Sequence, residues 1–501
     1  MKKGFVFIYG SEVVLRFITT DAFSVLERTF DITYVVLRSS ELVGEGQLEG
    51  GEGSIRRKVR WIPFDGERTR RWSELFDVSC IYYKERSSSF QVRYEEQARQ
   101  NPARMAHLET LAQPGVYEEH RAALEQEMGL HPDILELVVR ERPDFFVLPS
   151  ALLDYLTDDV LLIAQALAIP TLMLVLGWDN LSSKGLIYHQ PALLGVWGEQ
   201  SRRHAVEVQG VPPERVQVIG APQYEDFYPD SSVDRSALRT RLGVPPVGRL
   251  IVFAGTFRLF DETEVLKQID NAIEAGVLPA MHVFYRPHPW RVSRLSEDNF
   301  LDHSWRHVTM DPEMVDTYGV AKDGKETVTP DNFMFRLNHL AGVYQAADAV
   351  VSPMSTMLLE ALLFGLPTMA VAFGDGKHSW SADKVSRMLH FKELYEVQGL
   401  IVCRRRDDIF RQLDELISRI GDDAFSATLR NSTGYFVHRD GQSYAERVVP
   451  LVEMMLNAAQ SPPAYDSASV KPGKRYVTKG RKIIPSILGV AKRVFRRGAV
   501  E

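Results

Sequence analysis

Two neighbouring hydroxyl groups, those of Ser355 and Thr356, stand where the sequence predicts the start of a helix. They follow a short apolar strand candidate within residues 347–371 and precede an apolar run that ends near Gly365. A helix start presents unpaired backbone N–H groups and a partial positive charge, so hydroxyls there can help to bind phosphate oxygens. Glu360 lies about one turn further along, where its carboxylate could accept hydrogen bonds from ribose hydroxyls. The segment favours a site for a phosphorylated nucleotide; the plainer alternative is a capping serine on a buried helix.

A second candidate segment is the Arg-Pro-His-Pro sequence at 286–289, which ends the apolar strand candidate 281–285. Its two prolines stiffen the loop and remove backbone donors, so Arg286 and His288 are held with little freedom at the end of a strand. The guanidinium group offers a planar fork for phosphate, and the imidazole offers a donor whose charge changes near neutral pH. Alone the segment could be an ordinary surface loop, but combined with the hydroxyl pair it favours a phosphate site.

Together the two segments resemble the donor-nucleotide half of GT-B-fold glycosyltransferases. The resemblance is greatest to the branch that includes CDP-glycerol glycerophosphotransferases and related bacterial surface-polysaccharide enzymes, and it covers roughly residues 145–400. In that branch an Arg-x-His-Pro loop and a Ser-Ser or Ser-Thr helix start contact the pyrophosphate. The resemblance implies this role for Arg286, His288, Ser355 and Thr356. The ending formed by Glu360, Gly365 and Pro367 also resembles the GT-B pattern in which the glutamate faces the ribose.

The third segment of the resemblance is Gly-Trp-Asp-Asn-Leu-Ser-Ser-Lys-Gly at 177–185, where the relatives carry a Trp-His-Gly-x-x-x-Lys-like motif. Trp178 and Lys184 fit that motif, and Asp179 stands in place of the histidine. In the relatives this histidine is a candidate base for the acceptor hydroxyl. An aspartate can fill that role only if its surroundings raise its pKa or geometry compensates. Trp178, Asn180 and Lys184 are then candidate contacts to an acceptor or a phosphate; the alternatives are helix capping by Asp179 and Asn180 and a solvated Lys184.

The overall composition is that of an ordinary globular protein. The chain has 501 residues, of which 45% are hydrophobic and 25% charged, enough for two or three domains. Its two cysteines, Cys80 and Cys403, lie far apart and suggest neither a disulfide framework nor a zinc site, so a reducing compartment is expected. The apolar run near the N-terminus is too short for a signal peptide and is predicted to be the first strand. No apolar stretch reaches the length of about eighteen residues that a membrane span needs.

Apolar strand candidates alternate with helical patterns, which predicts parallel sheets covered by helices. In the first half these candidates are 4–9, 32–37, 145–148 and 171–176. The expected fold class is α/β and GT-B-like, with two Rossmann-like domains whose parallel sheets face a central cleft. Residues 1–228 would form the acceptor domain, with a Gly- and Glu-rich stretch at 43–54 and a helical insertion at about 84–131. That insertion either recognises an acceptor or is a plain helical decoration.

Residues 229–458 would form the nucleotide-donor domain. Gly255 and Thr256 end its first strand candidate, and in the GT-B pattern this loop approaches the donor phosphates. Arg258 is a candidate extra cation beside them.

The end of the chain has a different composition. Residues 459–473 resemble a linker, and residues 471–501 carry ten Lys or Arg against one acidic residue, a net charge of +9 in a chain of net charge −7. Apolar residues recur at helical spacing in the segment 474–501, namely Ile484, Ile487, Leu488, Ala491, Val494 and Phe495. This pattern indicates a basic amphipathic tail on an anionic membrane surface; the alternatives are a disordered tail or a helix docked on the acidic body. Nucleic acid binding is disfavoured because the body is acidic.

Several motifs are absent from the sequence. It has no Gly-x-x-x-x-Gly-Lys-Ser/Thr loop, no Gly-x-Gly-x-x-Gly after a strand and no Asp-x-Asp, which disfavours a kinase, a dehydrogenase and a metal-dependent GT-A transferase. We therefore expect no cofactor and no metal, with Arg286, His288 and helix amides stabilising the leaving diphosphate.

The expected function is transfer of a sugar from a nucleotide-diphosphate donor to a surface glycan or lipid-linked acceptor. The enzyme would be cytoplasmic and peripheral on the inner face of the plasma membrane. Three alternatives remain open: a glycerophosphotransferase using CDP-glycerol, a sugar-nucleotide 2-epimerase, and a catalytically silent GT-B scaffold in polysaccharide assembly. The last is favoured by the missing histidine at Asp179.

Overall fold

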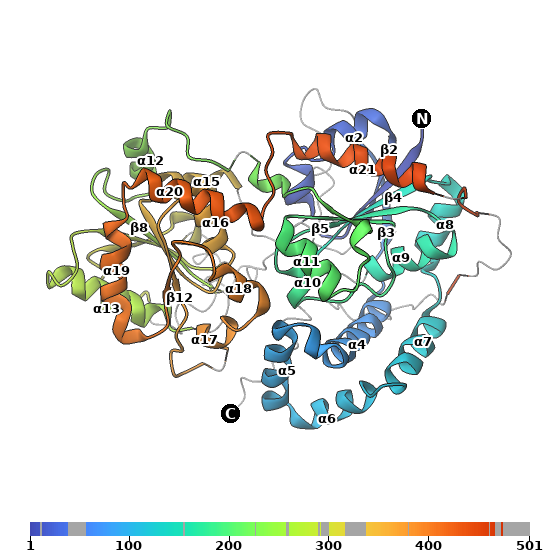
Figure 1. The fold of residues 1–501 in the computed structure, drawn as a ribbon, viewed down its shortest axis with the longest axis horizontal. Helices are drawn as coiled ribbons and strands as arrows, with labels where there is room; N and C mark the ends of the chain where they lie inside the picture. Colours follow the sequence, from blue (N-terminus) through green and yellow to red (C-terminus); the bar gives the residue numbers. More distant parts are fainter. Residues whose placement is uncertain are drawn as a thin grey trace. The chain divides into compact units, whose positions relative to one another are not determined.

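The computed structural model (Figure 1) contains two compact units, which we call unit 1 and unit 2. Unit 1 comprises Met1–Glu225 and Tyr435–Glu501, and unit 2 comprises Asp226–Gly434. The structure describes residues 1–10, 13–38, 57–153, 156–225, 227–256, 260–288, 291, 300–315, 337–378, 380–459, 461–465 and 472–473. The Gly- and Glu-rich stretch 43–54, Arg258 and the basic tail 474–501 lie outside these residues.

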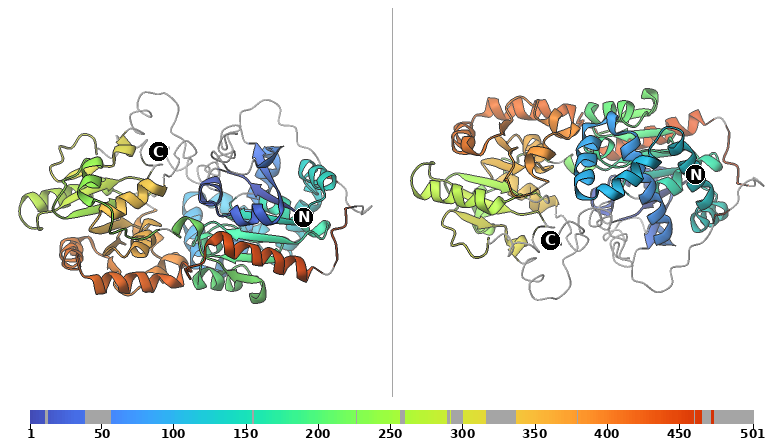
Figure 2. Two further views of the ribbon diagram at one scale, coloured as in Figure 1. Left: turned by 90° about the horizontal axis from the view of Figure 1, so that it is seen from above. Right: turned by 90° about the horizontal axis from the view of Figure 1, so that it is seen from below.

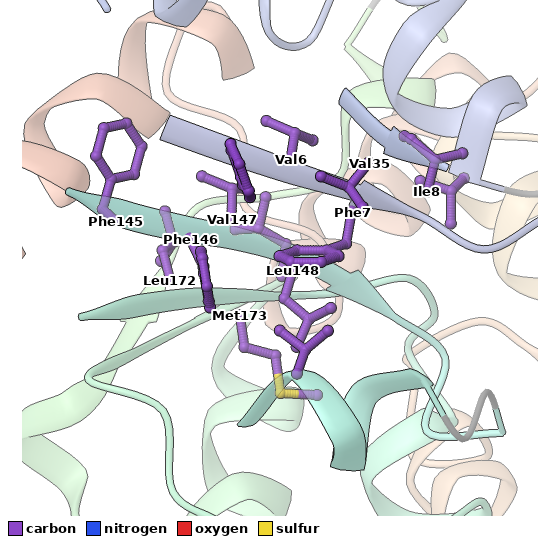
Figure 3. Close-up of a cluster of buried hydrophobic side chains, with 14 of the residues drawn as sticks. Val6, Phe7, Ile8, Val35, Phe145, Phe146, Val147, Leu148, Leu172 and Met173 are labelled. Atoms are coloured by element: carbon purple, nitrogen blue, oxygen red, sulfur yellow. The ribbon is translucent and has the colours of Figure 1, made fainter. Parts of the chain in front are cut away.

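Unit 1 is built on a seven-stranded parallel sheet of order β3-β2-β1-β4-β5-β6-β7. The strands are β1 (Lys3–Ile8), β2 (Asp31–Arg38), β3 (Lys58–Pro63), β4 (Phe145–Ser150), β5 (Thr171–Val175), β6 (Leu193–Val196) and β7 (Val216–Val218). The four strand candidates of the first half coincide with β1, β2, β4 and β5. Side chains of these central strands form the core, where Phe7 and Phe146 meet edge to face with ring centroids 5.1 Å apart (Figure 3). The parallel α/β prediction is confirmed for this half.

The helices of unit 1 include an insertion between β3 and β4. The main helices are α2 (Ser24–Thr29), α4 (Gly66–Tyr82), α5 (Ser88–Gln100), α6 (Pro102–Leu111), α7 (Val116–Met128), α8 (Pro132–Glu141), α9 (Leu156–Ala166), α10 (Asn180–Ser183), α11 (Glu199–Glu207) and α21 (Tyr444–Ala458). The insertion starts earlier than the predicted residue 84, because Asp65 caps α4 by accepting the backbone N–H groups of Glu67 and Arg68.

The predicted end of the second domain at residue 458 needs correction. The chain returns to unit 1 at Tyr435, and Figure 2 shows α21 among the elements of that unit. Tyr444, Val448 and Val452 on α21 are buried in the core cluster of unit 1, and the Tyr444 ring meets Phe17 edge on. The physical reason is the apolar face of α21, which is buried against α2 and β5.

Part of the predicted linker 459–473 also lies against unit 1. Ala464 donates its N–H to the Leu167 carbonyl at 2.8 Å, and Gly473 donates to the Leu130 carbonyl at 2.8 Å. The Tyr465 hydroxyl donates to the carbonyl of Pro143. The described residues of this segment are therefore docked through backbone hydrogen bonds, unlike a free linker.

Unit 2 is built on a six-stranded parallel sheet of order β10-β9-β8-β11-β12-β13. The strands are β8 (Leu250–Ala254), β9 (His282–Arg286), β10 (Val308–Met310), β11 (Ala349–Pro353), β12 (Thr368–Val371) and β13 (Ile401–Cys403). The main helices are α12 (Arg235–Arg241), α13 (Glu262–Glu274), α15 (Leu337–Ala346), α16 (Met357–Phe364), α17 (Ala382–Val385), α18 (Leu389–Leu394), α19 (Ile409–Ser418) and α20 (Asp423–Ser432). Two parallel sheets of this kind confirm the predicted α/β class for the whole chain.

Two further sequence expectations can be compared with the described residues. Cys80 and Cys403 are both free and buried. Among the described helices, none is both long enough and apolar enough to cross a membrane.

Candidate functional site

The sheet of unit 2 reverses its strand order between β8 and β11. From β8 the chain adds β9 and β10 on one side, and it then returns to place β11, β12 and β13 on the other side. In open parallel sheets the loops at the carboxyl ends of such neighbouring strands separate, and ligands bind there. The predicted phosphate-site residues lie at or after the carboxyl ends of β8, β9 and β11, so this edge of the sheet is the candidate donor site.

Hydroxyl groups join the carboxyl ends of β8 and β11 and the loops that follow them. Ser352 is fully buried, and its Oγ donates to the Ala254 carbonyl at 2.7 Å while lying 2.8 Å from the Oγ of Ser355. Thr256 is also buried, and its Oγ1 donates to the Met354 carbonyl at 3.2 Å. The structure thus brings Thr256 close to the segment that carries Ser355, although the two lie far apart in the chain.

Gly255 lets the loop after β9 approach the loop after β8. Its N–H donates to the Arg286 carbonyl at 2.8 Å. A Cβ atom at residue 255 would lie 2.6 Å from Oε2 of Glu262, 3.0 Å from the Cα of Pro287 and 3.1 Å from the backbone N of His288. Because those are backbone atoms and a buried carboxylate, no side chain fits there. The glycine therefore supports the close approach of the loops after β8 and β9 and the first turn of α13 at the candidate site.

Glu262 positions the candidate site, and no sequence motif indicates it. Its side chain is fully buried, and its Oε1 accepts the N–H of Thr256 at 2.8 Å. Its carboxylate also accepts the Tyr285 hydroxyl at 2.7 Å and pairs with Arg291 at 3.2 Å. Glu262 thereby fixes the loop after β8 from the protein interior. The only sequence signal is an acidic residue in the first turn of α13, which resembles an ordinary exposed charge.

Arg286 lies at the predicted place, at the end of β9, but its side chain is buried. The guanidinium forms an ion pair with Asp311 and lies 3.7 Å from Glu313. His339 contacts the same aspartate, with its Nε2 3.1 Å from Oδ2 of Asp311. Burial raises the pKa of Asp311, but the His339 hydrogen bond and the Arg286 charge outweigh it and lower that pKa below its ordinary value. Arg286 thus already neutralises the buried carboxylate of Asp311, and its contact with phosphate stays a prediction.

The helix start after β11 differs from a serine-capped helix. The N-cap residue of α16 is Thr356, and its side chain makes no capping hydrogen bond. Ser355 and Thr356 are both half-buried. One turn along, Glu360 is 8% exposed and accepts the Tyr344 hydroxyl at 3.0 Å. The helix ends at Gly365 with φ of 82°, as predicted. His288, half-buried, completes the set of predicted residues at this edge of the sheet.

In unit 1 the predicted acceptor residues follow β5. The Asp179 carboxylate is surrounded by donors: Lys184 Nζ lies 3.3 Å from Oδ2, the Ser183 hydroxyl is 3.2 Å from Oδ2, and the Asn180 amide is 3.2 Å from Oδ1. Asp179 occupies the N-cap position of α10 but makes no side-chain capping hydrogen bond, so the capping alternative is not supported. Trp178 is buried against Phe436, with ring centroids 5.9 Å apart.

The helical insertion holds this loop in place. The Ser87 hydroxyl, at the start of α5, donates to the Ser182 carbonyl at 2.6 Å, and the Arg93 guanidinium of α5 donates to the Ser183 carbonyl. These carbonyls belong to the last turn of α10, so no following turn of helix supplies backbone N–H groups to them. The insertion therefore does more than decorate the sheet, because it caps the segment that carries Asp179.

Gln209, which follows α11, holds the same loop through hydrogen bonds. Its Nε2 donates to the carbonyls of Leu181 at 2.7 Å and Gly185 at 3.1 Å, and its Oε1 accepts the N–H of Ile187 at 2.9 Å. Gly185 has no room for a side chain, because a Cβ atom there would lie 2.4 Å from the Leu152 carbonyl oxygen. One buried amide side chain thus satisfies three backbone groups of the loop.

We predict that Gln209→Leu lowers the free energy of unfolding by about 2–4 kcal/mol, since it leaves three buried backbone groups without partners. Chemical denaturation measures this change. Gln100→Leu is the control, because Gln100 is exposed and, among the residues that the structure describes, its side chain bonds only to Glu96, at 2.6 Å; its effect should stay within about 0.5 kcal/mol. Wild-type stability of the Gln209 variant would contradict the role given to this residue.

The described residues contain no group of three or more His, Cys, Asp or Glu side chains that could hold a metal ion. The expectation that the reaction needs no metal remains a prediction, as does the expectation of no cofactor.

Comparisons with known proteins show the fold. No protein-family model matches the sequence, and no curated protein matches it. A UDP-N-acetylglucosamine 2-epimerase from Rickettsia bellii is 11% identical, with a TM-score of 0.50 over 91% of this chain and 97% of that chain. A protein from Listeria monocytogenes assigned the same activity is 11% identical, with a TM-score of 0.50 over 92% of this chain and 98% of that chain. These similarities confirm the predicted GT-B-type fold.

A third structure bears on the branch named above. The wall teichoic acid polymerase TagF is 9% identical, with a TM-score of 0.42 over 91% of this chain and 88% of that chain. A similarity this low supports no inference, so the resemblance to the glycerophosphotransferase branch stays a prediction.

Proposed function

We propose that this protein is a glycosyltransferase that moves a sugar from a nucleotide-diphosphate donor to a surface glycan or lipid-linked acceptor. One observation carries the proposal: the segments at the carboxyl ends of β8, β9 and β11 meet at the point where the strand order of unit 2 reverses. The hydroxyls of Ser352 and Thr256 join β8 to β11, and the N–H of Gly255 joins β8 to β9. Such a site, with a helix start on it, suits a phosphorylated nucleotide. The two structures with a TM-score of 0.50 are named for UDP-N-acetylglucosamine, which agrees with a nucleotide-sugar ligand.

In this proposal unit 2 binds the donor. The N–H groups at the start of α16 and the hydroxyls of Ser355 and Thr356 bind the phosphates, and Glu360 faces the ribose. Gly255 and Thr256 bring the loop after β8 close to the diphosphate, and His288 adds a donor from the loop after β9. These fixed donors stabilise the charge that develops on the leaving diphosphate.

Unit 1 supplies the groups for the acceptor. Asp179 takes the proton from the attacking hydroxyl if the reaction inverts configuration; in a retaining reaction this role disappears. Lys184 lies 3.3 Å from the Asp179 carboxylate and would also attract a phosphate of the acceptor. The basic segment 474–501 belongs to the same proposal as a contact to anionic lipid, argued from its sequence alone.

The second candidate is a sugar-nucleotide 2-epimerase. It is favoured by the names of the two structures with a TM-score of 0.50, and the same donor site would serve it. An epimerase converts the nucleotide sugar without any acceptor, whereas a transferase needs one. Product formation from the donor alone therefore distinguishes the two activities.

We expect one nucleoside diphosphate among UDP, GDP, CDP and dTDP to raise the melting temperature of the purified protein, because a ligand that binds only the folded state stabilises it. Ser355→Ala with Thr356→Ala should weaken this ligand by about tenfold, since charge-assisted hydrogen bonds are lost. No shift with any nucleotide would contradict the proposed donor site and favour the silent scaffold.

The matched control changes two other hydroxyls of unit 2. Ser418 donates to the Glu415 carbonyl at 2.7 Å and Thr428 to the Ala424 carbonyl at 3.0 Å, each within its own helix. Ser418→Ala with Thr428→Ala should leave the nucleotide affinity unchanged. An equal loss in both double variants would mean that the effect is not specific to the start of α16.

A further inference from the structure

The loop that follows β12 carries a buried aspartate, Asp375, that accepts several hydrogen bonds. The side chain of Asp375 is fully buried, and it accepts the backbone N–H groups of Lys377 and His378, each at 2.9 Å. It also accepts the N–H of Asp261 at 2.8 Å, from the residue that caps α13. Nδ1 of His378 lies 2.5 Å from Oδ2 of Asp375. Burial raises the pKa of Asp375, but the hydrogen bonds from His378 and the backbone outweigh it, so this pKa is lowered.

The imidazole of His378 is held at its Nδ1 atom. Its Nδ1 and backbone N–H both contact Asp375, and the side chain remains 27% exposed. Its Nε2 makes no hydrogen bond to any residue in the described part of the chain. An imidazole whose Nδ1 is held by a buried carboxylate has a defined orientation, so Nε2 is available for a ligand.

Strand order places this pair beside the candidate donor site. β12 is the neighbour of β11, with Val371 paired to Pro353, and β8 is the neighbour of β11 on its other side. Asp261 follows β8 and Asp375 follows β12, so their hydrogen bond ties together the loops that flank the one carrying Ser355. The rings of Phe260 and Phe373 meet between the same two loops, with centroids 5.8 Å apart.

We propose that His378 is a further ligand of the terminal phosphate of the bound nucleoside diphosphate, with Asp375 as its positioning residue. This inference rests on the proposed function. When the bond between the sugar carbon and the diphosphate oxygen breaks, that oxygen keeps the electron pair and gains negative charge. Nε2–H of His378 donates a hydrogen bond to the terminal phosphate, while Nδ1–H donates to Asp375. The ring then donates a hydrogen bond from each of its two nitrogens.

The two amide variants of His378 separate a ligand role from a structural role. In His378→Gln the side-chain amide nitrogen can reach the place of Nε2, whereas in His378→Asn it lies near the place of Nδ1. By calorimetry with the diphosphate that stabilises the wild type, we expect His378→Asn and His378→Ala to bind about tenfold more weakly. His378→Gln should stay within about threefold of the wild type, because it keeps a neutral donor for the phosphate.

The matching nucleoside monophosphate is the second probe, and its affinity should be unchanged in all three variants because it lacks the terminal phosphate. The reverse pattern, with binding kept by His378→Asn and lost by His378→Gln, would mean that His378 only stabilises its loop through Asp375. This result would overturn the inference. Equal weakening of monophosphate and diphosphate would overturn it too. If the wild type binds no nucleoside diphosphate, the proposed function fails before the inference is reached.

His307 provides the matched control. It lies before β10, at the opposite edge of the same sheet, and its Nε2 is 3.1 Å from Oε2 of Glu274 with the side chain 31% exposed. His307→Asn and His307→Gln should both bind the diphosphate as the wild type does. Melting temperatures of all variants are measured alongside, so weaker binding in a variant that melts like the wild type counts for the inference. An unfolded His378→Gln would count against it, since a ligand role predicts a stable loop.

Discussion

Replacing Asp179 by asparagine should lower the turnover of sugar transfer by about 10²- to 10⁴-fold, the usual contribution of a general base. In the proposed reaction this carboxylate takes the proton of the acceptor hydroxyl as its oxygen attacks the sugar. Asparagine has nearly the same size, but its amide cannot take up that proton. The affinity for the nucleoside diphosphate, which we assign to unit 2, should stay unchanged. Initial rates at saturating donor and acceptor, together with calorimetry, test both statements.

Asp144→Asn is the matched control for this substitution. Asp144 also pairs with a lysine, at 2.9 Å from Lys2 Nζ, but it lies before β4 at the opposite edge of the same sheet. Its variant should turn over at the wild-type rate. Wild-type turnover of Asp179→Asn would refute the base assignment. Loss of nucleotide binding along with turnover would instead indicate that Asp179 mainly holds its loop, through Lys184 and Ser183.

Replacing Arg286 by methionine should lower the free energy of unfolding by about 3–5 kcal/mol, because it removes the permanently charged partner of a buried carboxylate and leaves the His339 imidazole beside it. The Arg286 side chain is 3% exposed, and that of its partner Asp311 is fully buried. Methionine fills much of the same volume, so most of the loss would come from the uncompensated charge. Chemical denaturation of the full chain measures the change.

Adding Asp311→Asn to that variant should restore part of the stability, since it removes the uncompensated charge. The control is Arg411→Met. The ion pair of Arg411 with Asp408 is on the surface, with the two side chains 65% and 35% exposed, so this substitution should lower the free energy of unfolding by about 1 kcal/mol or less. If Arg286→Met keeps wild-type stability and loses the nucleotide, Arg286 contacts the phosphate directly, as the sequence predicted. If it loses both, the weaker binding follows from the disrupted loop.

The candidate donor site shows which structural features local sequence patterns predict. The apolar runs before Gly255, Arg286 and Ser355 predicted three strands and the loops that follow them, and the strands lie there. Periodicity and turn residues act within a few residues, so they are visible in the sequence. Their meeting at one edge follows from the parallel order of the sheet, which the alternating pattern also indicated.

Residues that act across the chain were not predictable in this way. Glu262 holds the N–H of Thr256, and Asp375 holds that of Asp261, yet each resembles an ordinary surface acid in sequence. The domain boundary at 458 was wrong for a related reason. The apolar face of α21 could have covered either sheet, and only the packing of Tyr444 and Val448 assigns it to unit 1.

By itself, the sequence determined the α/β class, the strand ends that carry the candidate residues, the helix start at Ser355 and Thr356, and its glycine end at Gly365. Each of these depends on neighbours within one or two turns. The tertiary structure alone decided which charges meet, including the pairing of Arg286 with Asp311. The reason is physical: the energy of a charge depends on its burial and its partners, and both arise only when distant segments pack together.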